Sequence, residues 1–109
     1  MNSTLLNSSA VSEGTWVNVA GIISPFSVGL SGFASGDAAQ VYVTNNYSPP
    51  SPAIAPVAGD GTMQFGPTIT SDTMMVVVGN FAWIRVRKST AGGSPATTLA
   101  TLNGLSQIV

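Results

Sequence analysis

Glycine and proline interrupt this chain so often that long helices are excluded. Twelve glycines and seven prolines occur among its 109 residues, and these two types are the poorest helix formers. No window longer than a turn or two keeps apolar residues at the spacing of an amphipathic helix. The segments between the breaks are rich in Val, Ile and Thr, which favour a pleated surface. The chain is therefore predicted to be all-β.

Apolar and polar residues alternate in several of these segments, as half-buried strands require. The alternation covers residues 15–23, 26–33, 39–44 and 81–89. A continuous apolar run over residues 74–78 predicts a strand covered on both faces. Turn signals recur about every 8–12 residues, which is typical of sandwiches and jelly rolls. We predict an antiparallel β-sandwich, jelly-roll-like, of about seven to eight strands.

Three further strands complete this prediction. Residues 54–58 and 62–65 flank Gly59-Asp60-Gly61 and predict a hairpin, and residues 96–102 predict a strand after the Gly92-Gly93-Ser94 turn. The predicted core consists of the positions that alternation places inward: Val17, Val19, Ile23, Phe26, Val28, Leu30, Val41, Val43, Val76, Val78, Ile84, Val86 and Leu99.

The length predicts one domain. We place a single β-sandwich domain at residues 14–109 and an extended N-terminal arm at residues 1–13, whose apolar points are Leu5, Leu6 and Val11. Such an arm is either frayed or docked on a neighbour. Four prolines in residues 45–56 exclude a central strand there and favour a polyproline-like loop. Residues 103–109 are expected to add a short edge or an arm.

Charge is scarce in this sequence. Charged residues make up 6%, with a net charge of −1, against an average near ~25%. The absence of a basic block argues against a nucleic-acid partner held by phosphate contacts. Soluble domains normally carry a denser mixed charge. The surface is therefore either a neutral one rich in Ser and Thr, or one covered by another protein in an assembly.

The composition removes most catalytic chemistry. The chain contains no Cys and no His, which excludes disulfides, thiolate or imidazole metal ligands, and Ser–His or Cys–His catalysis. Asp37 and Asp60 each follow a glycine, as turn residues do. A Ca²⁺ site from these two and Asp72 is the remaining metal hypothesis. We expect no enzyme activity, no cofactor and no metal.

No membrane segment is predicted either. The sequence shows no positively charged leader with an apolar run, and no stretch of 18 apolar residues. We therefore expect synthesis in a cytoplasm and no membrane partner.

The most informative segment is residues 81–88, FAWIRVRK. Alternation places Ile84 and Val86 on one face and Trp83, Arg85 and Arg87 on the other. A Trp beside two Arg has the composition of an interface hot spot, although the same charges also suit a solvated strand that guards a sheet edge. The candidate protein-interface residues are Trp83, Arg85, Arg87, Lys88, Leu5, Leu6 and Tyr47. A sugar-stacking platform built from Trp16, Trp83, Tyr42 and Tyr47 is the alternative.

This segment also carries a resemblance. Trp83-Ile84-Arg85-Val86-Arg87, the turn Gly92-Gly93-Ser94-Pro95-Ala96 and the strand Thr97–Leu102 resemble the C-terminal half of small virion proteins of tailed bacteriophages. In the N-terminal half, Gly14-Thr15-Trp16-Val17, Phe26–Gly32 and Ala39–Val43 look like the strands of the same proteins. The likeness spans about residues 14–105, and the Pro-rich residues 47–56 depart from it.

The resemblance implies a one-domain β-sandwich that attaches to a capsid or tail. We therefore expect a structural subunit of a phage virion, most simply a capsid decoration or cement protein. Its partners would be the major capsid protein or other virion proteins, and it would form a homo-oligomer, a trimer or a dimer. The alternative is a carbohydrate- or receptor-binding module of a phage fibre or tail.

Overall fold

The computed structural model describes residues 2–51 and 55–105. These residues form nine strands: β1 (Asn2–Ser8), β2 (Ser12–Glu13), β3 (Val17–Asn18), β4 (Phe26–Ser31), β5 (Ala38–Thr44), β6 (Thr62–Gln64), β7 (Thr73–Val77), β8 (Trp83–Thr90) and β9 (Thr98–Asn103). Within the same residues there is no helix long and apolar enough to span a membrane.

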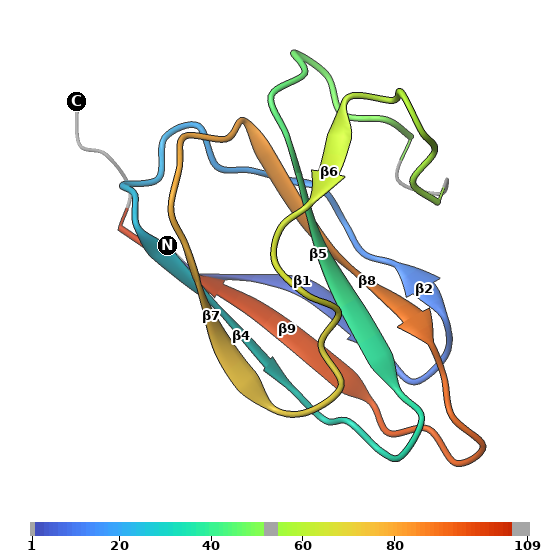
Figure 1. Ribbon diagram of the computed structural model, residues 1–109. Helices are drawn as coiled ribbons and strands as arrows, with labels where there is room; N and C mark the ends of the chain where they lie inside the picture. Colours follow the sequence, from blue (N-terminus) through green and yellow to red (C-terminus); the bar gives the residue numbers. More distant parts are fainter. Residues whose placement is uncertain (1, 52–54, 106–109) are drawn as a thin grey trace.

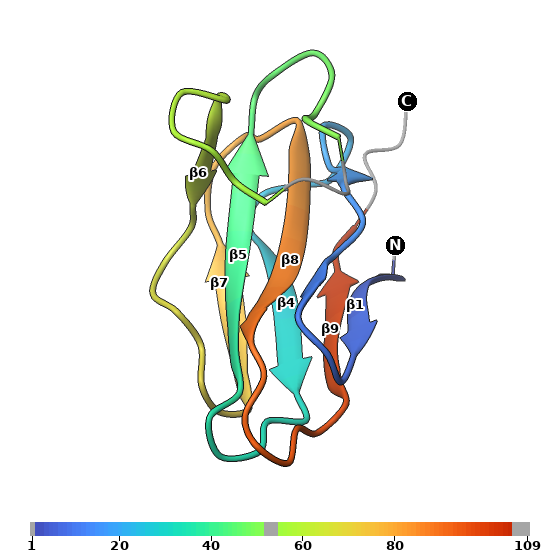
Figure 2. The ribbon, with the colours of Figure 1, turned by 90° about the vertical axis from the view of Figure 1, so that its right-hand side faces the viewer.

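The strands form two antiparallel sheets that lie face to face (Figures 1 and 2). The first, which we call sheet I, has the order β1-β9-β4-β7. The second, sheet II, has the order β2-β8-β5-β6, and β3 also pairs with β8. The all-β class and the antiparallel pairing expected from the alternation are confirmed, and the arrangement is consistent with a β-sandwich.

The core lies between the sheets and largely follows the predicted alternation. The predicted core residues that are buried are Val19, Phe26, Val28, Leu30, Val41, Val43, Ile84 and Val86. Val17 is half-buried and packs against this cluster. Each fully buried residue of this kind contributes about 1.5–3 kcal/mol to folding.

Four predicted core residues are wrong. Val76 and Val78 are 57% and 65% exposed, because Met75 and Val77 are the residues of that run that face the core. Leu99 is 39% exposed, since Ala100 and Leu102 face the core from the same strand. Ile23 is 47% exposed because β3 ends at Asn18. The run at 74–78 therefore belongs to a strand at the end of a sheet, with one face open to solvent.

Residues 2–8 and 12–13 are extended, as expected of an arm, with a bend at 9–11 between them, but they dock on their own chain. β1 pairs with β9 along its whole length, with a bulge between Thr4 and Leu6. Leu5 and Leu6 are 1% and 4% exposed within the core. The burial of these two leucines ties β1 into sheet I, and β2 of the same segment pairs with β8 in sheet II.

The middle of the chain also differs from expectation. β6 pairs with β5, through Tyr42 opposite Gln64, and residues 55–58 of the expected hairpin form no strand. Residues 45–51 and 55–57 contain no strand, in agreement with the expected loop. Of the edge or arm expected at 103–109, Asn103 belongs to β9, and residues 106–109, like Ile54, lie outside the described residues.

Candidate functional site

Strand β8 places the expected hot-spot residues on two different faces. Ile84, Val86 and Lys88 point into the sandwich and are buried. Trp83, Arg85 and Arg87 lie on the outer face of sheet II, as alternation predicted. Trp83 and Arg87 are half-buried there.

Arg85 is covered although it lies on an outer face. Its guanidinium carbon lies 4.7 Å from the ring centre of Trp16, in a cation–π contact. Arg85 is 1% exposed and Trp16 is 7% exposed. Burial lowers the pKa of the Arg85 guanidinium, while the Glu13 carboxylate opposes that shift. The contact removes both side chains from the surface that a partner would meet.

Arg87 is held by partners within the chain. Its Nε donates to both carboxylate oxygens of Glu13, at 2.8 and 2.9 Å. Its Nη1 donates to Oε1 of Gln40 at 2.9 Å. The Arg87 side chain is 17% exposed and Glu13 is 14% exposed. This pair therefore ties β2 to β8 and leaves little free charge on sheet II.

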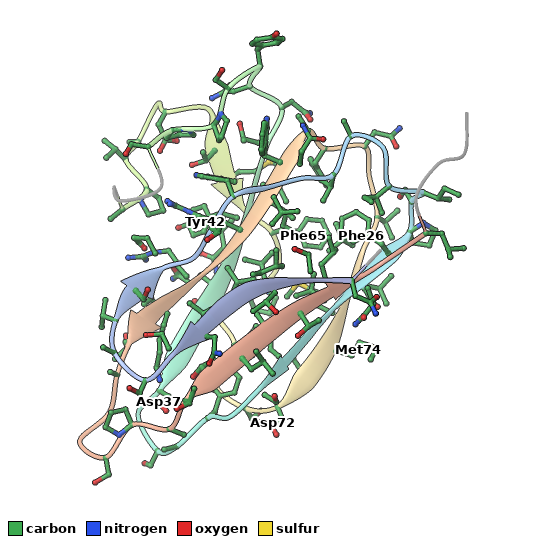
Figure 3. The ribbon with its side chains drawn as sticks, turned by 180° about the vertical axis from the view of Figure 1, so that it is seen from behind. Phe26, Asp37, Tyr42, Phe65, Asp72 and Met74 are labelled. Atoms are coloured by element: carbon green, nitrogen blue, oxygen red, sulfur yellow. The ribbon has the colours of Figure 1, made fainter. Side chains whose placement is uncertain are left out.

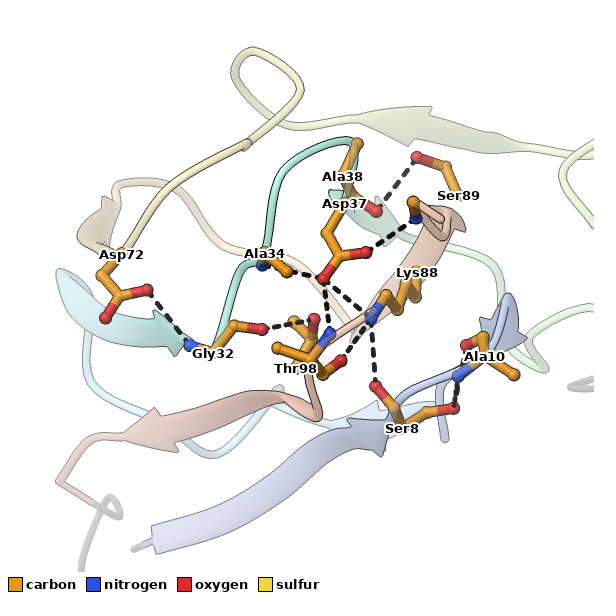
Figure 4. Close-up of polar contacts among 12 residues, drawn as sticks. Ser8, Ala10, Gly32, Ala34, Asp37, Ala38, Asp72, Lys88, Ser89 and Thr98 are labelled. Carbon is orange, nitrogen blue, oxygen red and sulfur yellow. Dashed lines mark hydrogen bonds and ion pairs between the residues drawn. The ribbon is translucent and has the colours of Figure 1, made fainter. Parts of the chain in front are cut away.

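Lys88 and Asp37 form a buried pair at one end of the sandwich (Figure 4). The Lys88 ammonium lies 3.4 Å from Oδ2 of Asp37, and both side chains are 0% exposed. Lys88 also donates to the carbonyls of Ala96, at 2.7 Å, and Ser8. Since one ammonium contacts segments of both sheets, the pair joins the two layers.

Asp37 accepts three backbone hydrogen bonds besides this ion pair. The donors are the amides of Gly92, Ala34 and Ala96, at 2.9, 2.9 and 3.0 Å. These bonds, the one from Gly92 first, and then the Lys88 charge hold the pKa of Asp37 well below its usual range. A carboxylate fixed in this way is a structural acceptor that closes two turns.

Asp60 and Asp72 also support the backbone. Asp60 accepts from the Thr62 hydroxyl at 2.6 Å and from the amides of Val57 and Thr62, and these bonds lower its pKa. Asp72 accepts from the amide of Gly32 at 3.1 Å. The turn role predicted for Asp60 is confirmed. The described residues hold no group of three or more acidic side chains able to bind a metal ion, so the three Asp do not converge.

The interface candidates are corrected by these positions. Arg85, Lys88, Leu5 and Leu6 are buried within the protein's own fold, so they are not available to a partner. Tyr47, which is 100% exposed, remains available, and Trp83 and Arg87 remain so in part. The expected aromatic platform does not form, because Trp16 is buried against Arg85.

The structure instead exposes a surface that sequence reasoning missed, the outer face of sheet I. Residues that lie directly opposite one another across the ladders form rows on this face. The rows are Asn2, Asn103, Ser27 and Val76; then Thr4, Thr101, Gly29 and Met74; then Asn7, Leu99 and Ser31. No charged side chain lies in any row.

The apolar part of this face lies along β7. Met74, Val76 and Val78 are 67%, 57% and 65% exposed, and Met74 projects away from the sandwich (Figure 3). Beside Val76 is an open groove of about 320 Å³, lined by Ile23, Pro25, Phe26, Ser27, Val76, Asn103, Gly104 and Leu105. We call the residues Ile23, Met74, Val76, Val78 and Leu105 the apolar strip.

The sequence carries a signal for this strip, but the signal does not distinguish a core strand from an exposed one. The continuous run MMVVV at 74–78 is compatible both with a central strand and with an end strand whose outer face is apolar. No protein-family model matches the chain, and no curated protein or solved structure matches it.

Proposed function

We propose that this protein is a non-enzymatic structural subunit of a larger assembly, attached through the outer face of sheet I. The observation that carries the proposal is the apolar strip at the side of a sheet face that bears no charge. Contiguous exposed apolar surface rimmed by polar residues marks sites of protein–protein contact. Ser, Thr, Asn and Gly around the strip offer hydrogen bonds with no charge to desolvate.

The distribution of carboxylates supports a structural role. Glu13 holds Arg87, and Asp37 holds Lys88 and three amides. Asp60 closes a turn and Asp72 holds Gly32. Each acid thus serves to fix the backbone or another strand.

The assembly that we propose is the virion of a tailed bacteriophage. The support is the resemblance of the β8 strand, Trp83–Arg87, and of the following Gly-Gly-Ser turn to small virion proteins, together with the scarcity of charge. In this proposal the protein is a capsid decoration or cement protein. The major capsid protein or another virion protein then covers sheet I and is stabilised by the contact.

Titration onto tailed-phage particles stripped of their accessory proteins tests this role. We expect saturable binding that a lysine in the middle of the face, Thr101→Lys, weakens by roughly tenfold or more, because it buries an unpaired charge. The matched control is Thr90→Lys, at the exposed end of β8 in sheet II. Absence of saturable binding by the folded protein, or equal weakening by both variants, would overturn the proposal.

One observation favours a second function, the recognition of a carbohydrate or receptor. Tyr47 is fully exposed in the loop that follows β5, and exposed tyrosines supply apolar contact with a polar tip. A glycan array screened with the native protein and with Tyr47→Ala tests it. Binding that depends on Tyr47 would support this function, and a blank array with a folded sample would exclude it.

A further inference from the structure

Strand β7 is the least protected strand at the side of either sheet. Among the described residues it pairs with β4 alone, and no backbone hydrogen bond outside the ladders reaches residues 73–77. Its place at the side of sheet I is visible in Figures 1 and 2. The outward amides and carbonyls of such a strand are a template for another strand.

The other outer strands carry the usual protections. β1 has a bulge between Thr4 and Leu6. β6 has three residues, and β2 and β3 have two each. β7 has five residues in regular register, TMMVV, with no proline, bulge or charged side chain. Natural proteins protect exposed edge strands with bulges, prolines, charges or short length. A strand that lacks all of these protections is a candidate for pairing with a strand of another chain.

We infer that this edge pairs with the same edge of a second copy, which extends sheet I across a two-fold axis. The inference deepens the proposed function, on which it rests, by naming the first partner within the assembly. An antiparallel pair of identical strands is related by a two-fold rotation, so one patch serves both copies. In one register, all five residues of β7 lie opposite a residue of β7 in the second copy. This register places Met75 on the two-fold axis.

This register matches apolar side chains on the outer face. Met74 of one copy lies opposite Val76 of the other, and the relation is repeated by symmetry. Residues that lie directly opposite one another in a ladder point to the same face of the sheet. Met74 and Val76 both point outward and are more than half exposed in the single chain. Met74 of the second copy therefore packs against the side of Val76 that faces away from β4, whereas the groove lies on the β4 side of Val76, beside Ser27 and Asn103. A flexible methionine can adapt its side chain to such a contact.

The charges permit this contact. Each copy has a net charge of −1, and the charged side chain nearest to β7 in the chain is Asp72. In the proposed register Asp72 lies opposite Val78 of the second copy, so the two Asp72 residues are about six residues, or roughly 20 Å, apart. That exceeds the Debye length of ~8 Å at physiological salt. Like charges thus do not oppose the pairing.

The size of the contact sets its strength. Pairing of two five-residue strands buries less than the ~1,200 Å² of a typical stable complex. We expect a dissociation constant between about 10 μM and 1 mM in solution, which attachment of both copies to one particle strengthens by raising their effective concentration.

Cysteine cross-linking tests the register, and the chain has no native cysteine to interfere. Met74→Cys mixed with Val76→Cys is expected to give a disulfide-linked dimer, because directly opposed Cα atoms lie about 4.5–5.5 Å apart. Met74→Cys alone places its two thiols on the diagonal, at about 7–8 Å, and is expected to cross-link at most one tenth as fast. Equal rates, or no cross-link up to about 1 mM protein, would overturn the inference.

Sedimentation equilibrium of the full chain gives a second test. The mass is expected to rise from 11.0 kDa toward twice that value with concentration, and Val76→Lys to weaken the dimer by at least about tenfold, since it brings two lysines within roughly 7 Å. Met74→Lys is a second variant should the first not fold. Thr90→Lys is the control that keeps the wild-type constant. A strictly monomeric wild type contradicts the inference.

Particle binding separates this inference from the proposed function. A protein that binds stripped particles but neither dimerises nor cross-links would refute the β7 contact alone. A protein that dimerises through β7 but binds no particle would refute the virion role and leave the dimer standing.

Discussion

Sheet II and the turns that lead into it hold six of the seven charged side chains, whereas the outer face of sheet I holds none. The six are Glu13, Asp37, Asp60, Arg85, Arg87 and Lys88. Of these seven residues, Asp72 alone is exposed, and the other six are buried or half-buried. Most of the few charged side chains therefore contact other parts of the same chain. The exposed surface is even poorer in charge than the composition indicates.

The two faces differ in what holds them. The outer side of sheet II is tied together by the Arg85–Trp16 contact and by the Glu13–Arg87–Gln40 hydrogen bonds. The outer face of sheet I has short polar side chains and an exposed apolar strip, and no charged side chain lies in its rows. The first face thus has its partners within the chain, and the second is the face that we propose a partner covers.

The largest effect is expected from breaking the charged end of the sandwich. Asp37→Ala leaves the Lys88 ammonium buried without its counter-charge and three amides without an acceptor. We expect the Tm to fall by on the order of 15 °C or more, measured by circular dichroism. The matched control, Asp72→Ala, loses one exposed contact and is expected to change Tm by about 3 °C at most. Similar losses in both would contradict the role given to the buried pair.

A smaller effect is expected where an added methyl group probes the packing. Gly14 is crowded by the carbonyl oxygens of Val86 and Leu5, whereas Gly29, on the outer face of sheet I, has nothing near its missing side chain. We expect Gly14→Ala to lower Tm by roughly 10 °C and Gly29→Ala to change it by less than ~3 °C. Calorimetry of the two variants measures this contrast. A strong loss from Gly29→Ala would show that sheet I is not open.

Alternation predicted the inner face of the sandwich well and the end strands poorly. The inward residues of β4, β5 and β8 were predicted correctly, because in each strand they alternate with more polar residues on the other face. In β9, Leu99 and Leu102 lie three positions apart and must face opposite ways, and the sequence does not say which is inside. A run such as 74–78 lacks alternation altogether, so its place at the side of a sheet was not readable.

The charged residues illustrate a second limit. Lys88 and Asp37 are 51 positions apart, and Arg85 and Trp16 are 69 apart, so their contacts depend on the strand order, which pattern alone does not determine. Arg85 and Lys88 are interface candidates by sequence, yet both are buried within the fold, which is rare for charged side chains. The candidate surface was missed for the complementary reason, because apolar residues were assigned to the core.

Acid is expected to weaken the charged side of the molecule before the neutral one. The pKa values of Asp37 and Asp60 are lowered from an ordinary 3.8, so in each case the folded protein binds the proton less readily than the unfolded chain. Their contribution to stability is complete above the unfolded pKa and is lost as pH falls through and below it. The free energy of unfolding in urea should therefore decrease from pH 5 to pH 2.5. Asp37→Asn should flatten this decrease, and an unchanged slope would refute the assignment.

The smallest effect is expected on the apolar strip itself. Met74→Thr and Val76→Thr replace outward side chains that are already more than half exposed, and threonine keeps the strand preference. At micromolar concentration, where the β7 contact is dissociated, we expect Tm to change by less than ~2 °C, while particle binding and self-association both weaken. Val77→Thr, at the buried position between them, is the control that should destabilise. If the outward variants unfolded as readily as Val77→Thr, the strip would belong to the core of the single chain, and the contrast between the two faces would be lost.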